Sequence, residues 1–203
     1  MSTPSRFATK ASLRTAAILM VVAIVGLLAS CGQTEEPVAE RSAAAAPPPG
    51  PSASDVDGLS ARAALALANR WKDSVPSVTS IVDTQRVAFQ FADGSTAEVP
   101  LPADEMVVAI APYVKNTHPC AVHVMSGCQG ELVGAPLKVR GVTSDGVVVI
   151  DEQLTTMANG FVEVWLPRNL ELALSIEFDG LQTTGTIRTY ADSNTCITTM
   201  QLL

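Results

Sequence analysis

Residues 160–180 have the sequence GFVEVWLPRNLELALSIEFDG, in which two runs of alternating polar and apolar side chains flank a short turn. Alternation with a period of two is typical of strands that bury one face. Pro-Arg-Asn between the runs and Asp-Gly after them are turn-forming residues. The pattern predicts antiparallel strands at 160–166 and 171–178, with Phe161 and Trp165 on one face as core residues rather than a platform for a cofactor.

The remaining C-terminal sequence has the same character. Turn signals such as Ser-Asp-Gly and Ala-Asn-Gly separate short apolar runs, which predict strands at 136–142, 147–151 and 183–189. Turn signals at such spacing favour a small antiparallel β-sandwich. One more strand is expected at 195–200, where it would carry Cys196 to the sheet.

The preceding sequence combines one helix with strands. Apolar residues at helical spacing predict a helix over 58–74, with Asp57 as its N-cap and Pro76 beyond its end. The period then changes to two, and Asp93-Gly94 is a strong hairpin signal. This pattern predicts four strands, at 78–82, 87–91, 96–101 and 106–111.

Together these patterns predict an α+β fold that is mainly antiparallel β. We expect a helix and strands in an N-terminal portion at 57–128, which ends in a stretch rich in cysteine and histidine. A β-sandwich-like C-terminal portion at 129–203, carrying Cys196, should follow it. The length is enough for one domain, or two small ones, with a real core.

The first 30 residues have the features of an export signal. Three basic residues precede an apolar run at 16–28, which is too short for the roughly 20 residues of a membrane-spanning helix. Leu28-Ala29-Ser30-Cys31 has the form of a lipobox, so residues 1–30 are predicted to be a lipoprotein signal peptide and Cys31 the lipidated residue. Ordinary cleavage near Ala29 and an uncleaved anchor are the alternatives, and both also place the domain outside the cytoplasm.

Residues 31–56 are rich in Ala, Pro, Ser and Glu, without aromatic residues, and predict a disordered tether. Removal of residues 1–30 takes away three basic residues and no acidic ones, which leaves 10 basic against 20 acidic residues. Such an acidic balance argues against nucleic acid and anionic lipid as partners. It favours attraction of cations, although solubility alone also explains it.

The stretch at 117–128, THPCAVHVMSGC, contains both histidines of the protein and two of its four cysteines. Imidazole, thiolate and thioether select Cu(I), Zn(II) and related soft ions over Ca(II) and Mg(II). The spacing matches no zinc finger. The stretch therefore predicts an irregular metal or redox site on a loop that follows the strand at 106–111.

A structural disulfide is the alternative interpretation of these residues. Cys120 and Cys128 are eight positions apart, and in an exported protein such a pair often closes a short loop, with nearby histidines on the surface. Cys196 leaves an odd number of thiols after lipidation of Cys31, so at least one must stay free, bind a ligand or pair between molecules.

Further ordered motifs surround the site. They are Ala111-Pro112-Tyr113, Thr117-His118-Pro119-Cys120 through His123, Cys128-Gln129-Gly130-Glu131, Asn159-Gly160-Phe161, Trp165-Leu166-Pro167-Arg168, Phe178-Asp179-Gly180 and Thr195-Cys196-Ile197-Thr198-Thr199. This set covers most of residues 75–203 and resembles the CueP family of periplasmic copper-binding proteins.

The resemblance implies an extracytoplasmic copper protein that acts in copper resistance and hands copper to client enzymes. By position, the family's three cysteines fall on Cys120, Cys128 and Cys196, with His118 and His123 as accompanying candidate ligands. Two thiolates, from Cys128 and Cys196, would hold Cu(I), and thiols would also reduce Cu(II). The lipobox and tether depart from a free periplasmic carrier and imply one held at the membrane.

Two other classes of function stay open. In a thiol-disulfide oxidoreductase of the cell envelope the three cysteines would exchange disulfides, although the sequence has no CxxC. In a β-rich surface module the histidines would be dispensable. Apart from thiol-dependent Cu(II) reduction we expect no enzymatic activity. The expected partners are copper ions, a copper-accepting client and the membrane through the lipid anchor only, and a homodimer is open.

Overall fold

A computed structural model describes residues 50–203 of the chain. The predicted signal peptide, Cys31 and most of the predicted tether lie outside the described residues. The described residues belong to one compact unit. Over the described range, no helix has the length and apolar character needed to cross a membrane.

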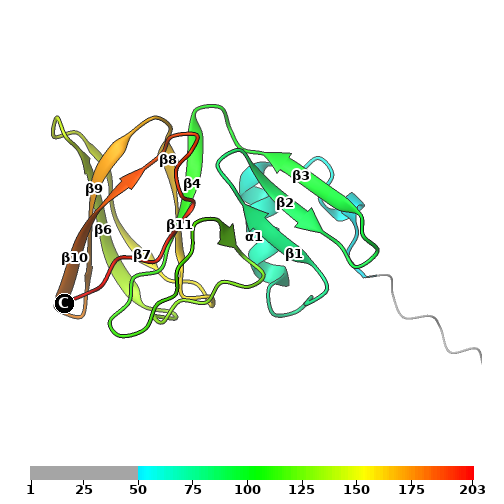
Figure 1. Ribbon diagram of the computed structural model, residues 1–203, viewed down its shortest axis with the longest axis horizontal. Coiled ribbons are helices and arrows are strands. Elements are labelled where there is room, and N and C mark those ends of the chain that lie inside the picture. The colour runs from blue at the N-terminus through cyan, green and yellow to red at the C-terminus, as the bar shows by residue number, and fades with distance from the viewer. Residues whose placement is uncertain (1–49) are drawn as a thin grey trace, which may run out of the picture. The chain divides into compact units, whose positions relative to one another are not determined.

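Two helices open the described part of the chain (Figure 1). The short 3-10 helix η1 spans Ala53–Asp55, within the segment predicted as a tether, and is followed by Val56, which is 2 % exposed in the core. The helix α1 spans Ala61–Trp71 and is shorter than the predicted 58–74. Its N-cap is Ser60 rather than Asp57, because the Ser60 hydroxyl accepts a hydrogen bond from the backbone N–H of Ala63.

A four-stranded antiparallel sheet of order β3-β2-β1-β5 packs against α1. Its strands are β1 (Thr79–Val82), β2 (Arg86–Gln90), β3 (Thr96–Pro100) and β5 (His123–Val124). Trp71, at the end of α1, contacts Phe89 and Phe91 edge-on, with ring centroids 5.8 and 6.2 Å away. The last strand, β5, belongs to the Cys/His stretch, so this sheet holds one side of the site.

A three-stranded sheet of order β11-β4-β8 holds the other side. Its strands are β4 (Glu105–Ile110), β8 (Val162–Pro167) and β11 (Cys196–Ile197). The central strand β4 pairs antiparallel with β8 and parallel with β11, and it is buried on both faces. Burial on both faces explains why its sequence is continuously apolar rather than alternating.

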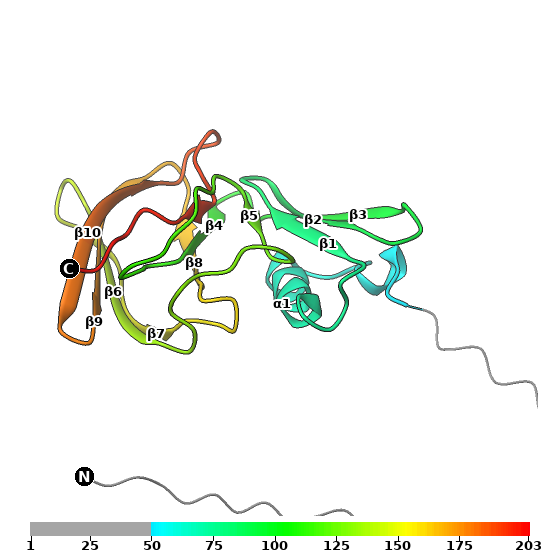
Figure 2. The same cartoon turned by 60° about the horizontal axis from the view of Figure 1, so that its bottom comes forward.

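The third sheet, of order β10-β9-β6-β7, lies beside β4 and β8 (Figures 1 and 2). Its strands are β6 (Pro136–Thr143), β7 (Val148–Thr155), β9 (Glu171–Phe178) and β10 (Leu181–Arg188). Leu172, Leu174 and Ile176 alternate along β9 and are fully buried in the core shared with β4 and β8. The two sheets thus pack in a sandwich-like way, but the packing includes β4, which the sequence placed in the N-terminal portion at 57–128.

The predicted fold class, α+β and mainly antiparallel β, is confirmed. Every strand predicted from the sequence is present; the strand at 171–178 matches β9 to the residue, and the others have shifted ends. The largest shifts are at β7, which continues to Thr155 rather than 151, and at the C-terminus, where the predicted strand at 195–200 is only Cys196–Ile197. The sequence did not predict β5, because two residues are too few to show a periodicity.

Candidate metal centre

The five candidate ligands come from three segments that meet beside β4. His118 and Cys120 lie on the loop after β4, and His123 begins β5. A turn in which the N–H groups of Gly127 and Cys128 bond to the carbonyl of Val124 returns the chain toward the loop. Cys196 arrives from the C-terminus as the first residue of β11, where it pairs with Ala109 of β4.

Thr195 ties the C-terminal segment to the rest of the site. Its hydroxyl donates a hydrogen bond of 2.7 Å to the carbonyl of Val82 and accepts one of 3.1 Å from the N–H of His123. The N–H groups of Thr195 and Cys196 both bond to the carbonyl of Ala121. These buried bonds join three distant segments and fix the distance between His123 and Cys196.

Glu131 holds the segment that leads to His118. One of its carboxylate oxygens, Oε2, accepts hydrogen bonds from the backbone N–H groups of Val114, Lys115 and Asn116. These bonds lower the pKa of Glu131, because each favours the ionised carboxylate. Glu131, the first acidic residue after the stretch at 117–128, therefore orders the loop that carries His118.

A close backbone crossing fixes the chain after Cys128. The N–H of Gly130 donates a 2.7 Å hydrogen bond to the carbonyl of Asn159. A Cβ added at Gly160 would lie 2.6 Å from the carbonyl oxygen of Gly130, and one added at Gly130 would lie 2.6 Å from that of Gly160. Gly160 also has a φ of +76°, in the left-handed region. Both positions therefore need glycine.

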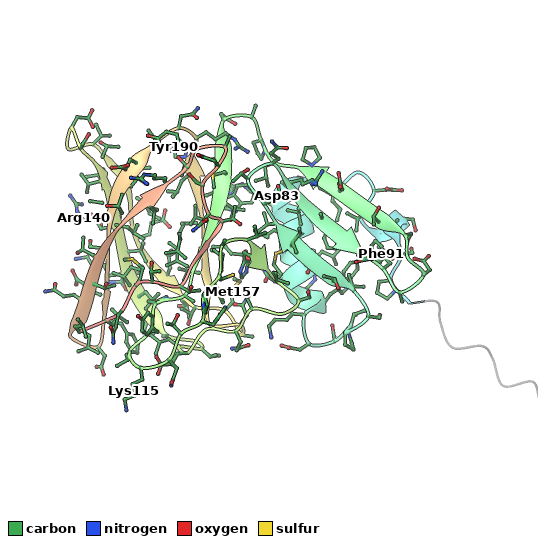
Figure 3. The ribbon with its side chains drawn as sticks, in the orientation of Figure 1. Asp83, Phe91, Lys115, Arg140, Met157 and Tyr190 are labelled. Atoms are coloured by element: carbon green, nitrogen blue, oxygen red, sulfur yellow. The ribbon has the colours of Figure 1, made fainter. Side chains whose placement is uncertain are left out.

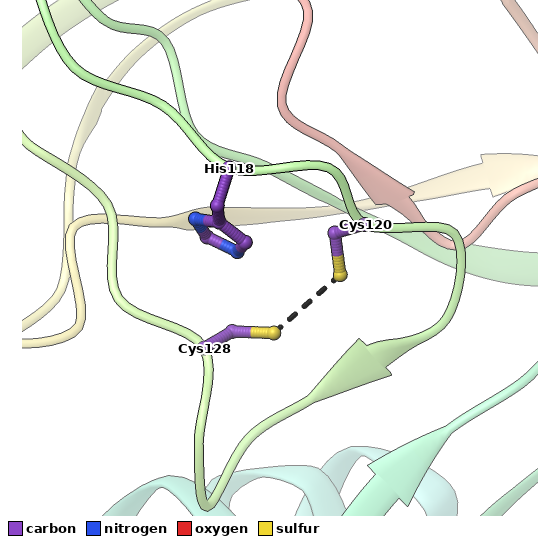
Figure 4. Close-up of side chains that lie close together, drawn as sticks. All are labelled: His118, Cys120 and Cys128. Carbon is purple, nitrogen blue, oxygen red and sulfur yellow. Dashed lines mark hydrogen bonds between the residues drawn. The ribbon is translucent and has the colours of Figure 1, made fainter.

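The structure brings the five candidate ligands together in two overlapping sets. The outer set consists of His118, Cys120 and Cys128, and the inner set of His123, Cys128 and Cys196. Within each set, the ligand atoms lie within 4.8 Å of one another, and Cys128 belongs to both. The side chains of the outer set point toward one another from two sides of the loop (Figure 4).

The two sets differ in exposure. The inner ligands are buried, with 0 % of His123, 8 % of Cys128 and 1 % of Cys196 exposed, whereas His118 and Cys120 are partly exposed. The apolar surroundings include Ala109, Ala111 and Phe161, and Met157 packs against them (Figure 3).

Three buried imidazole nitrogens lack a hydrogen-bond partner among the described residues. They are Nε2 of His118 and both Nδ1 and Nε2 of His123. A buried polar group without a partner costs about 1–3 kcal/mol, and proteins rarely leave one unsatisfied without a reason. Unpaired imidazole nitrogens beside three sulfur atoms fit a soft metal ion, which both kinds of donor bind.

The thiols influence one another strongly. A hydrogen bond with Cys196, opposed by burial and supported by His123, lowers the pKa of Cys128 to about 2. The pKa of Cys196 is raised, first by this same hydrogen bond and then by burial. Burial is the main cause that raises the pKa of Cys120. Cys128 is therefore the thiol of the cluster that ionises most readily, because neighbouring thiol and imidazole groups stabilise its thiolate.

The three described cysteines are free, so the loop-closing disulfide is not formed. The Sγ atoms of Cys120 and Cys128 are 3.5 Å apart, much longer than the S–S bond of about 2.05 Å. Their approach still shows that the loop can bring these two sulfurs together.

Glu163 is a site residue that the sequence did not identify. Its side chain is 10 % exposed, accepts a 2.9 Å hydrogen bond from Nδ2 of Asn69 on α1, and lies 3.8 Å from Nε2 of His123. Burial raises the pKa of Glu163. A signal was present, because Glu163 shares a strand face with Phe161 and Trp165, where a charged residue is unexpected.

Phe161 and Trp165 do not share one environment. Phe161 packs against the His123 ring, with centroids 4.5 Å apart, whereas Arg62 of α1 lies 4.2 Å over the Trp165 ring. The prediction that Phe161 is a core residue is correct for its burial, but it did not include the contact with His123. Phe161 is part of the wall of the candidate metal centre.

Comparison with known proteins identifies the family. Residues 66–201 match the family described as "Periplasmic copper-binding protein CueP". The chain belongs to the CueP family. The structure is also similar to the one described as "Crystal Structure of S.CueP", with a TM-score of 0.64 and 29 % sequence identity, over 74 % of this chain and 92 % of that chain. A search of curated proteins found no match.

Membership of the CueP family confirms the resemblance seen in the sequence motifs. The family binds copper in the periplasm, so copper is the metal and the location is extracytoplasmic. The donor set agrees with this metal, because thiolate sulfur and imidazole nitrogen are the ligands that copper prefers in its two common oxidation states.

Proposed function

We propose that this CueP protein is a copper carrier of the cell envelope that holds Cu(I) at the inner set. The thiolates of Cys128 and Cys196 are the main ligands and His123 is the third. One observation carries this proposal: three buried side chains, two from β5 and the turn after it and one from β11, place their ligand atoms within 4.8 Å of one another, and neither nitrogen of His123 has a hydrogen-bond partner among the described residues.

The chemistry of Cu(I) supports the inner set as its site. Cu(I) is a soft cation that accepts few ligands and prefers thiolate sulfur. A buried thiolate is costly without a compensating charge, and a bound cation supplies that charge. Burial also keeps water and oxidants away from the metal.

We extend the proposal to reduction of Cu(II). Two sulfur atoms, those of Cys120 and Cys128, each give one electron to a Cu(II) ion, and an S–S bond forms between them. Two Cu(II) ions thus become two Cu(I) ions, and any proton held by a reacting thiol is released. An external thiol must then reduce the S–S bond before Cys128 can bind Cu(I) at the inner set. The 3.5 Å distance between these sulfurs supports this pairing.

The lipobox supports a location at the membrane. Acylation of Cys31 and the tether that follows would hold the copper site near the membrane, where a copper-accepting client protein receives the ion. The variant Cys31→Ala should block acylation and release the protein from the membrane fraction. Unchanged membrane fractionation of this variant would count against the anchor.

Competition with a chromogenic Cu(I) chelator tests the main proposal. Loss of either main ligand, in Cys128→Ser or Cys196→Ser, should weaken Cu(I) binding by at least about a hundredfold, because serine oxygen is a poor ligand for a soft ion. Anaerobic purification keeps the thiols reduced, and far-UV circular dichroism controls for folding. Affinities equal to that of the wild type in both variants would sink the proposal.

The 3.5 Å thiol pair also favours a second candidate, a thiol-disulfide oxidoreductase. The double variant His118→Ala with His123→Ala separates the two functions. In a copper protein it slows reduction of Cu(II), measured by stopped-flow appearance of chelated Cu(I), while disulfide exchange is retained. Equal Cu(II) reduction rates in the wild type and the double variant would show that the histidines take no part in the reduction and that the cysteines alone form the site.

A further inference from the structure

The two ligand sets are neighbours that share the sulfur of Cys128. Cys128 is 8 % exposed and belongs to both sets, whereas the other outer ligands, His118 and Cys120, are more exposed than His123 and Cys196. A metal ion can therefore move from one position to the other without leaving Cys128.

A surface pocket opens on the outer side. It has a volume of about 280 Å³ and is lined by Asn116, Thr117, His118, Gln129, Gly130 and Glu131. His118 is thus at once a wall of the pocket and a member of the outer set. Its Nε2 atom is buried and has no hydrogen-bond partner among the described residues. The unpaired nitrogen gives an incoming soft ion its first nitrogen ligand.

The outer and inner positions differ in how firmly they are held. His123 is linked to Thr195 by a buried hydrogen bond, the N–H groups of Thr195 and Cys196 bond to the carbonyl of Ala121, and the side chains of His123 and Cys196 are at most 1 % exposed. Cys120 lies on a partly exposed loop where its thiol contacts the carbonyl of Val122 and the sulfur of Cys128. A more exposed donor suits capture and release, and a buried one suits retention.

We propose that copper passes between the pocket and the buried site through the outer set, as a relay that pivots on Cys128. The inference rests on the proposed copper-carrier function. Cu(I) binds first to His118, Cys120 and Cys128, and then exchanges Cys120 and His118 for Cys196 and His123. The Cu–S bond to Cys120 breaks as the bond to Cys196 forms. The proton that Cys196 gives up is taken by the Cys120 thiolate, so the transfer releases no net proton.

Exchange kinetics test the relay. The outer variant His118→Ala with Cys120→Ser keeps the inner set, so its equilibrium affinity for Cu(I) should stay within about threefold of the wild type. Transfer of Cu(I) to and from bicinchoninate, measured by stopped flow, should be at least about tenfold slower in both directions, because only the barrier is raised. The inner variant Cys196→Ser should show the opposite result, with weak binding and fast exchange.

A second variant tests the route without changing a ligand. Gln129→Trp fills the pocket beside His118, and it should slow exchange while the affinity for Cu(I) is retained. Exchange at the wild-type rate in both the outer variant and Gln129→Trp would overturn the relay, even if Cu(I) binds tightly. Wild-type affinity in Cys128→Ser and Cys196→Ser would instead overturn the copper-carrier function itself, so the two failures are distinct.

Discussion

The sheet β10-β9-β6-β7 and the metal centre are built in different ways. In the sheet, β9 pairs with β10 across the Asp179-Gly180 turn, and buried residues alternate with more exposed ones along β9. In the metal centre, β5 contributes only two residues of strand, and the decisive hydrogen bonds join residues far apart in sequence. The bond from Thr195 to Val82 spans 113 positions, and that from His123 to Thr195 spans 72.

Because of this difference, the two regions should respond differently to single substitutions. A sheet with many equivalent backbone bonds spreads its stability over many residues. The metal centre depends on a few side chains and on two glycines that cross closely, and each of these has no substitute nearby. Single substitutions around the centre should therefore cost more than substitutions on the exposed surface of the sheet.

The largest effect is expected at the glycine crossing. Gly160→Ala puts a methyl group 2.6 Å from a backbone oxygen and also needs a φ of +76°, so it should lower the free energy of unfolding by about 3 kcal/mol or more. Gly180→Ala is the matched control, because Gly180 has a φ of +79° and no atom within 4 Å of the added Cβ. It should cost about 1 kcal/mol. If urea unfolding showed that both variants lose the same free energy of unfolding, the close contact at the glycine crossing would not matter for stability.

A smaller effect is expected at Thr195. Thr195→Val keeps the shape of the side chain but leaves the buried Val82 carbonyl and His123 N–H without their partner, so the free energy of unfolding should fall by about 2 kcal/mol. Cu(I) affinity should fall as well, because these bonds fix the inner set. Thr195→Ser retains the hydroxyl and should preserve that affinity. If the valine variant binds Cu(I) like the serine variant, Thr195 does not position the site.

The thiolate at Cys128 predicts a pH dependence. Its pKa is lowered from an ordinary value near 9 to about 2, so the stabilisation it contributes is fully present above pH 9 and is lost as the pH falls toward 2. The raised pKa of Cys196 acts oppositely, and its contribution is lost as the pH rises above 9. Metal-free reduced protein should therefore show the 240 nm absorbance of one thiolate at pH 5, absent in Cys128→Ser. A wild-type titration with a midpoint near 9 would refute this.

The sequence predicted the sheets well because their information is local. Alternation and turn residues fixed the strand at 171–178 to the residue, since each strand there buries one face. The ligand types were visible for a similar reason, since both histidines and two cysteines lie within 117–128. Cys196 entered through the family resemblance, because its contact with the loop arises only from tertiary folding.

Other parts of the site have no local signal. The division of five ligands into two sets depends on burial, which the order of residues within 117–128 does not reveal. Glu163 stands out as a charged residue on the strand face of Phe161 and Trp165, but its partner has no local signal, because Asn69 donates to its carboxylate only once α1 packs against the strand. Thr195 resembles any β-strand threonine until the Val82 carbonyl is placed within hydrogen-bond distance. Such roles come from long-range packing and not from periodicity.

The smallest effect is expected on the exposed surface of the sheet β10-β9-β6-β7. Arg140 of β6 and Asp151 of β7 face each other across the strands, with a 2.8 Å contact and side chains 41 % and 47 % exposed. Water and salt screen such a pair, so Arg140→Ala should change the free energy of unfolding by less than about 0.5 kcal/mol and leave Cu(I) affinity unchanged. A double-mutant cycle with Asp151→Ala, run at low and high salt, isolates the pair. A coupling energy above about 1 kcal/mol would mean that this sheet, like the metal centre, depends on single side-chain contacts, and the contrast between the two regions would fail.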